Sequence, residues 1–124
     1  NIGAHALKDS GNDIENFLSY LEISKNKSFN CMPGSGSTML QCFLKGAKAI
    51  VAGTSVAFPA EVMNLYKAIV KKDALKILNN LQSKVDECRA KQMRDIMRPA
   101  ASYIILREKG IDIGWPLPPW PLKI

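Results

Sequence analysis

Three short apolar runs stand out in the first half of the sequence, at residues 2–8, 29–32 and 48–53. Each run has the length of a strand and is followed by turn residues or by a helix start, so we predict three β-strands. The third run is almost continuously apolar, which is typical of parallel strands covered on both faces. A parallel sheet with helices between its strands is the expected core of this half.

Between and after these runs, apolar residues recur at helical spacing, which predicts helices there. Asn12 and Glu15 have the spacing of a capping box, and the helix that follows is expected to end near Ser24. Gly46 fits the end of a second helix. The apolar positions that define four predicted helices are Ile14, Phe17, Leu18 and Leu21; Met39, Leu40, Phe43 and Leu44; Val62, Leu65, Tyr66 and Ile69; and Leu75, Leu78, Leu81, Val85 and Cys88.

The second half of the sequence is expected to be helical until its tail. Pro59 suits the first turn of a helix, and residues 71–73 mark the break before a longer one. Pro99 ends or kinks what precedes it, and a last helix should close near Gly110. The tail at residues 114–121 is too rich in proline for a helix, so it should lie extended against the body, held by its two tryptophans.

The first apolar run ends in a lysine whose place in the sheet matters. Strand alternation puts Lys8 on one face with Ile2, Ala4 and Ala6, and puts Gly3, His5 and Leu7 on the other. An inward lysine at the carboxyl end of a barrel strand lies where active sites form, and it is a candidate nucleophile. The strand pattern alone favours the alternative, a surface lysine just beyond a strand. His5 is expected to be structural.

Composition narrows the class of protein. The chain has 124 residues, 47% hydrophobic and 23% charged, which is globular composition. No apolar run approaches the roughly 20 residues that span a bilayer, so we expect no membrane partner and a cytoplasmic location. The net charge of +6 comes largely from residues 67–98, where bases alternate with acids and apolar residues. We interpret this as solvated helix faces rather than a nucleic-acid surface, since no aromatic interleaving accompanies it.

The cysteines do not indicate a metal site. Cys31, Cys42 and Cys88 are odd in number and lack paired spacing, and His5 is the only histidine. We therefore expect buried thiols in a reducing compartment and no metal.

Strand and helix alternation predicts an α/β fold, but three strands are too few for a closed sheet. A complete (β/α)8 barrel takes about 250 residues, and an open three-stranded piece would leave apolar edges unpaired. We expect the chain to be the C-terminal half of such a barrel, with about three parallel strands in residues 1–58. Residues 59–124 would supply the last barrel helix, extra C-terminal helices and the Pro-rich tail.

Several motifs, in order, strengthen the case for chemistry at Lys8. The run Ala6-Leu7-Lys8-Asp9-Ser10 resembles the Schiff-base lysine strand of the dihydrodipicolinate synthase and N-acetylneuraminate lyase family, which includes the 2-keto-3-deoxygluconate aldolases. Further similar stretches, at the family's spacing, are Met32-Pro33-Gly34-Ser35-Gly36, residues 46–54, Phe58-Pro59, residues 98–101 and residues 110–114. Two departures exist. Many members have Lys-Asp-Ser-Ser-Gly-Asp where this chain has residues 8–13, and synthases often carry an arginine near Leu117.

The resemblance implies a class I aldolase mechanism without metal or separate cofactor. In it, Lys8 attacks the ketone carbon of pyruvate or another 2-keto acid, and the resulting imine stabilises a carbanion next to the carbon–carbon bond that breaks or forms. Ser10, Gly34, Ser35 and Val51 match substrate-binding positions, with Ser37 as a further candidate hydroxyl. Simpler roles stay open. Ser10 could only cap the first helix, the glycine loop could be only a turn, and Val51 could be core.

The resemblance also implies what must come from elsewhere. The family's acid–base tyrosine and carboxylate-binding hydroxyls belong to earlier strands, so we expect this chain to need the N-terminal half of the barrel and to be inactive alone. A 2-keto-3-deoxygluconate-type aldolase is preferred, because Ser102-Tyr103 and residues 116–121 are more similar to those enzymes. The alternatives are a dihydrodipicolinate synthase, which condenses pyruvate with aspartate semialdehyde, and a non-catalytic half-barrel or interaction module. Family members are commonly homotetramers, so a tetramer or dimer is expected.

Overall fold

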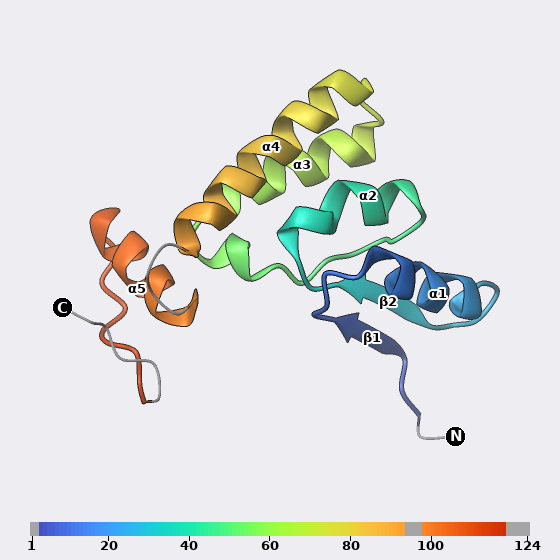
Figure 1. The fold of residues 1–124 in the computed structure, drawn as a ribbon, viewed down its shortest axis with the longest axis horizontal. Coiled ribbons are helices and arrows are strands. Elements are labelled where there is room, and N and C mark those ends of the chain that lie inside the picture. The colour runs from blue at the N-terminus through green and yellow to red at the C-terminus, as the bar shows by residue number, and fades with distance from the viewer. Residues whose placement is uncertain (1–2, 94–97, 119–124) are drawn as a thin grey trace.

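Residues 3–93 and 98–118 are described by a computed structural model of the chain. The N-terminal unit is a two-stranded parallel sheet with one crossover helix: β1 (Ala6–Asp9), α1 (Ile14–Ser24) and β2 (Asn30–Pro33). Lys8 lies opposite Met32 in the register of the two strands. The carboxyl ends of β1 and β2 therefore lie side by side, where two parallel strands release their following loops (Figure 1).

The first helix begins one residue later than the capping-box spacing predicts. Asp13, not Asn12, is the N-cap, and its carboxylate accepts a hydrogen bond from the Asn16 amide at 3.1 Å. An aspartate is as good a cap as an asparagine, and its negative charge also suits the helix N-terminus. The helix buries Phe17 and ends at Ser24, as predicted.

The expected third strand does not form. After β2 come the short 3₁₀ turn η1 (Gly36–Thr38) and α2 (Met39–Leu44), and then residues 47–52 run without regular structure to a second turn, η2 (Gly53–Val56). The Val51 amide donates to the Pro33 carbonyl at 3.1 Å, alongside the end of β2. A single backbone hydrogen bond beside the end of β2 does not pair two strands, so the apolar run is extended but is not a strand.

Two long helices form a hairpin above the sheet. α3 (Pro59–Lys71) begins with proline at its first turn and ends at Lys72, which takes a left-handed conformation with φ of 59°. α4 (Leu75–Gln92) then returns antiparallel to α3 toward η2, and α5 (Arg98–Glu108) follows at the far end of the molecule (Figure 1). The division of the chain at residue 58 stays a prediction.

The buried core lies between this hairpin and the segments below it. Met39, Leu65 and Val85 are fully buried and come from α2, α3 and α4. Gln82 of α4 ties the hairpin to the loop below, since its carbonyl oxygen accepts from Leu40 N and its amide donates to Gly36 O, both at 2.9 Å. A second cluster of Phe17, Cys31, Cys42 and Ala47 closes the space under α1. All three cysteines are free and buried, as predicted.

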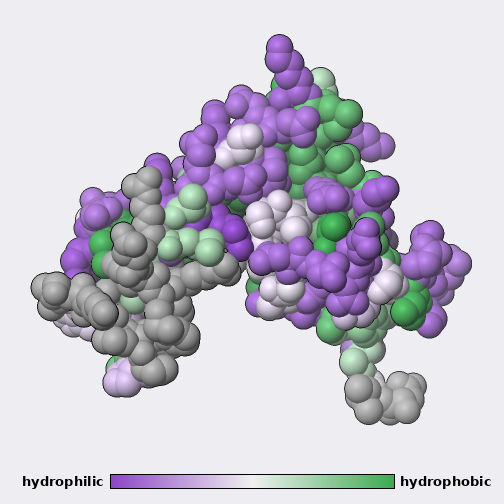
Figure 2. Space-filling view, in the orientation of Figure 1, coloured by the Kyte–Doolittle hydropathy of each residue, from purple (hydrophilic) through white to green (hydrophobic). Residues whose placement is uncertain are grey.

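Exposed apolar side chains occur in several elements of the described chain. Figure 2 shows apolar surface over the end of α3 and the start of α4, where Val70, Leu75 and Ile77 are each at least half exposed. Helical spacing predicts burial of Leu75 and of Leu44, and both predictions are wrong. Leu75 lies in the first turn of α4, beyond the end of α3, and Leu44 is the last residue of α2. In β1, Ala6, Leu7 and Lys8 are exposed as well.

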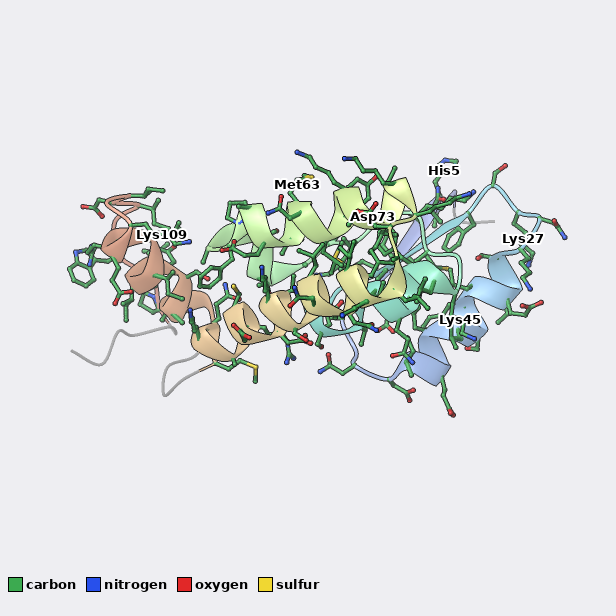
Figure 3. All side chains as sticks on the ribbon, turned by 90° about the horizontal axis from the view of Figure 1, so that it is seen from above. His5, Lys27, Lys45, Met63, Asp73 and Lys109 are labelled. Carbon is green, nitrogen blue, oxygen red and sulfur yellow. The ribbon has the colours of Figure 1, made fainter. Side chains whose placement is uncertain are left out.

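The chain after α5 is held by polar contacts. Lys109, at one end of the molecule in Figure 3, donates to Ala57 O at 2.6 Å and lies 4.3 Å from the centre of the Phe58 ring. Arg107 lies 4.1 Å from the centre of the Trp115 ring and bonds to Asp112 and Gly114 O. The tail is thus held at Trp115, although that side chain is 60% exposed. Trp120, like Ile2, lies outside the described residues.

Candidate functional site

Lys8 occupies the carboxyl end of β1, one residue before the strand ends. Leu7 lines a hollow with Tyr20 and Ile23 of α1, so the side chain of Leu7 lies on the face of β1 that α1 covers. Alternation then directs Lys8 to the opposite face, as the sequence predicts. His5 shares the face of Leu7 but is exposed, and its carbonyl oxygen accepts from the Asn30 amide at 3.1 Å.

Gly34 follows β2 and lies beside the end of β1, close to the lysine side chain. Its amide donates to Asp9 O at 2.6 Å, which continues the β1–β2 pairing by one residue. A Cβ on Gly34 would lie 2.7 Å from Asp9 O, 2.9 Å from Lys8 Cε and 2.9 Å from Ser10 Cα. Real Cβ atoms do not approach backbone this closely, so only glycine lets the two strand ends meet beside the lysine.

The structure also brings Val51 and Ser10 to this end of the sheet. Val51 is bonded through its amide to Pro33 O, one residue from Gly34, and its side chain is exposed rather than in a core. Ser10 is exposed directly after β1. The alternative in which Ser10 only caps α1 is wrong, because Asp13 is the cap and Asp9 accepts the Gly11 amide at 2.8 Å.

The two serines of the glycine loop bond to each other. Ser35 Oγ and Ser37 Oγ lie 2.8 Å apart, and Ser35 is buried. The Ser35 carbonyl accepts from the Thr38 hydroxyl at 3.2 Å. The loop is therefore more than a simple turn, since it folds its hydroxyls inward as it enters η1.

A cavity of about 390 Å³ is lined in part by Gly34, next to the end of β2. Its walls come from the glycine loop, η2, the end of α4 and the start of α5, together with Ile113 of the tail. The buried polar side chains of the described chain are Ser35, Thr54, Gln92 and Ser102, and all four line this cavity. Ser35 was the only one predicted as a site residue.

Gln92 connects three walls of the cavity. Its side-chain amide donates to Ser102 Oγ at 3.2 Å and to Gly53 O at 3.5 Å. Sequence reasoning missed it, although a signal existed. Gln92 continues the buried stripe of α4 four residues after Cys88, so a polar residue stands where the spacing demands an apolar one. A glutamine buried on such a stripe needs a polar partner, and here that partner is Ser102.

Among the described residues, the side chains near the carboxyl ends of β1 and β2 indicate neither a metal site nor a reactive thiol. The described part of the chain contains no group of three His, Cys, Asp or Glu side chains placed to hold a metal ion. Burial raises the pKa of the Cys42 thiol, and the Asp9 carboxylate adds to this effect against the hydrogen bond from Thr38. A buried thiol with a raised pKa is a poor nucleophile.

Within residues 3–93 and 98–118, no helix has the length and apolar character needed to cross a bilayer.

Comparisons with known proteins identify the fold. Neither a protein-family model nor a curated protein matches the sequence. Among solved structures, the chain is similar to a dihydrodipicolinate synthase of Bacteroides thetaiotaomicron (TM-score 0.83, 25% identity) over 96% of this chain and 41% of that one. It is similar to 2-keto-3-deoxygluconate aldolases of Sulfolobus solfataricus (TM-score 0.80, 24% identity, 96% and 40%) and Picrophilus torridus (TM-score 0.77, 22% identity, 97% and 43%).

These matches confirm the resemblance predicted from the motifs, at the level of the fold. The chain has the α/β fold of the C-terminal part of these enzymes, and it spans about two fifths of their length.

Proposed function

We propose that this chain is the C-terminal part of a class I aldolase whose Schiff-base lysine is Lys8. The single observation that carries the proposal is the position of Lys8 beside Gly34 at the carboxyl ends of two parallel strands, in a fold shared with aldolases of this type. Active sites of parallel α/β barrels form at this end of the strands.

The proposed reaction proceeds through an imine. The Lys8 amine attacks the ketone carbon of a 2-keto acid, and water leaves to give an iminium. In cleavage, the electron pair of the adjacent carbon–carbon bond moves into the iminium to form an enamine, while the hydroxyl of the departing fragment loses its proton and becomes an aldehyde. Protonation of the enamine carbon and hydrolysis then release pyruvate and free Lys8. Condensation follows the reverse path.

The neighbouring residues receive supporting roles in this proposal. Gly34 lets the two strand ends meet closely beside Lys8, and the backbone at Val51 faces the bound acid. Ser10 supplies a hydroxyl group beside Lys8, and Ser35 supplies a buried hydroxyl group next to Gly34. The group that moves the proton and the donors that hold the carboxylate come from the N-terminal part of the barrel, and the complete enzyme is a homo-oligomer.

The preferred substrate is a 2-keto-3-deoxy sugar acid. What supports it is the presence of four buried polar side chains in the otherwise largely apolar lining of the cavity next to Gly34, since amide and hydroxyl groups can pair with substrate hydroxyls. A product assay with pyruvate and either glyceraldehyde or aspartate semialdehyde separates this substrate from the synthase alternative.

Borohydride trapping tests the mechanism. The longest natural form of the chain is incubated with pyruvate, reduced with borohydride, digested, and analysed by peptide mass spectrometry. We expect a stable adduct on the Lys8 peptide, its loss in Lys8→Arg, and its retention in Lys48→Arg, a matched change at an exposed lysine. A folded protein that yields no adduct would instead support the non-catalytic module.

A further inference from the structure

The cavity beside Gly34 collects polar side chains that the proposed imine chemistry does not need. Thr54, Gln92, Ser35 and Ser102 are 4, 5, 7 and 9% exposed. Ser35 is bonded to Ser37, and Gln92 is bonded to Ser102, so these groups are held at fixed positions within the protein. Their concentration around one space of about 390 Å³ gives a largely apolar cavity a few placed polar groups, as in binding sites for small molecules.

This cavity continues directly from the proposed reaction site. Gly34 is shared between them, because it lines the cavity and also lies against Lys8 Cε. A molecule joined to Lys8 through its ketone carbon would have to pass Gly34 to reach the cavity.

Two of the polar residues come from helices that follow the proposed barrel segment. Gln92 is the last residue of α4, and Ser102 lies in the second turn of α5. Their side chains bond to each other at 3.2 Å, and Gln92 also reaches the Gly53 carbonyl. The two helices thus fix an amide and a hydroxyl at set positions on one wall.

The composition of the walls favours a neutral, hydroxylated chain. Val56, Met93 and Ile113 supply apolar surface, the four buried polar side chains supply amide and hydroxyl groups, and Arg89 is the one charged residue among the described residues of the lining. Amide and hydroxyl groups both donate and accept, as alcohols do. Within residues 3–93 and 98–118, no carboxylate lines the cavity to bind an amino group.

We propose that Gln92 and Ser102 are specificity-determining residues, which recognise the hydroxyl groups of the aldehyde half of the aldol substrate. The inference rests on the proposed function, since it needs the 2-keto acid to be bound to Lys8. A site built to hydrogen-bond a substrate hydroxyl discriminates against an analogue that lacks it, because the buried protein groups are then left unpaired.

The experiment compares two aldehydes of equal carbon number. Condensation with pyruvate is measured in the longest natural form of the chain, using glyceraldehyde and propanal, which lacks both hydroxyls. The readout is the ratio of the two kcat/KM values, because any loss from misfolding or weaker pyruvate binding cancels in it. We expect the wild type to prefer glyceraldehyde, and Ser102→Ala and Gln92→Leu each to reduce that preference by about tenfold per lost hydrogen bond.

Matched variants act as controls. Ser83→Ala lies on α4 and Gln41→Leu on α2, both at exposed positions, and neither should change the ratio. Ser102→Ala removes a single oxygen and keeps the helix, so it tests the inference even where Gln92→Leu fails to fold.

Each outcome is decisive. An unchanged ratio in Ser102→Ala, in a wild type that forms the borohydride adduct on Lys8, overturns this inference and leaves the proposed function standing. A folded wild type that forms no adduct overturns the proposed function and this inference with it.

Discussion

At the scale of the residue, Gly34 has the tightest environment near the proposed site. The space that a Cβ would need is already filled by the backbone of Asp9 and Ser10 and by the Lys8 side chain. Two of these three obstacles are backbone atoms, which cannot move aside by a change of rotamer. The distance between the strand ends therefore depends on the absence of one carbon atom.

Substitution of Gly34 should be costly for that reason. Gly34→Ala is expected to lower the free energy of unfolding by about 1–3 kcal/mol, the usual cost of overpacking, and to reduce borohydride trapping on Lys8. Urea unfolding and the trapping assay measure the two effects. Gly53→Ala is the control for stability, since a Cβ there meets nothing within 4 Å and the backbone φ is not positive. Equal midpoints for the two variants would contradict the crowding argument.

Some residues of the site could be predicted from the sequence, and others could not. Lys8 and Gly34 could be singled out because the motifs around them resemble those of the aldolase family, whereas the strand pattern alone favours a surface lysine and a simple turn. Thr54 and Ser102 gave no such signal, since single hydroxyl residues in turns and helices are common. Only the fold shows that they share a cavity with Gln92.

At the scale of the element, the helices were predictable and the third strand was not. Each helix carries apolar residues over several turns, and the end of α3 at Lys72 and the start of α4 follow the predicted break. An apolar run such as residues 48–53, in contrast, does not indicate whether another strand lies beside it to form the backbone hydrogen bonds of a sheet. Strand formation requires partners that are distant in sequence, and here only Val51 has one in the described chain.

The turn after α5 is an element whose stability should depend on pH. The Gly114 amide, followed by the Arg107 guanidinium, holds the pKa of the Asp112 carboxyl below its ordinary value. A carboxyl with a lowered pKa in the folded state stabilises that state at neutral pH, and the contribution is lost as the pH falls through the lowered pKa. We expect the Arg107–Trp115 contact to open in that acid range.

Trp115 fluorescence measures this opening. In a Trp120→Phe background, the emission should change at a pH below the ordinary range of an aspartate, and Asp112→Asn should remove that transition. The variant Asp73→Asn, at a half-buried aspartate in the α3–α4 turn, should leave the transition in place if the carboxyl of Asp112 is responsible. A transition that persists in Asp112→Asn would assign it to another group.

At the scale of the whole molecule, stability is distributed unevenly. The α3–α4 hairpin contains the fully buried Leu65 and Val85, whereas β1 exposes most of its side chains and pairs with β2 over four residues. Figure 1 shows β1 at the edge of the structure, with nothing on its outer side. Regions with few buried contacts open first.

Hydrogen exchange should reproduce this order. In the chain by itself, amides of α3 and α4 are expected to exchange slowest, and those of β1 and β2 fastest. In the longest natural form, β1 should gain protection if an N-terminal part of a barrel covers its exposed face and edge. Mass spectrometry of the same peptides in both forms makes the comparison, with peptides from α4 as the internal reference. Identical exchange of β1 in the two forms would contradict the proposed half-barrel.

Lys8 and the proposed specificity-determining residues are encoded far apart in the gene. Lys8 and Gly34 are encoded near one end of the sequence, and Gln92 and Ser102 near the other, with the α3–α4 turn between them. A single recombination crossover at that turn would exchange one wall of the cavity and keep the strand ends intact. The architecture thus allows substrate range to change by exchange of whole segments, without any new mutation beside the lysine.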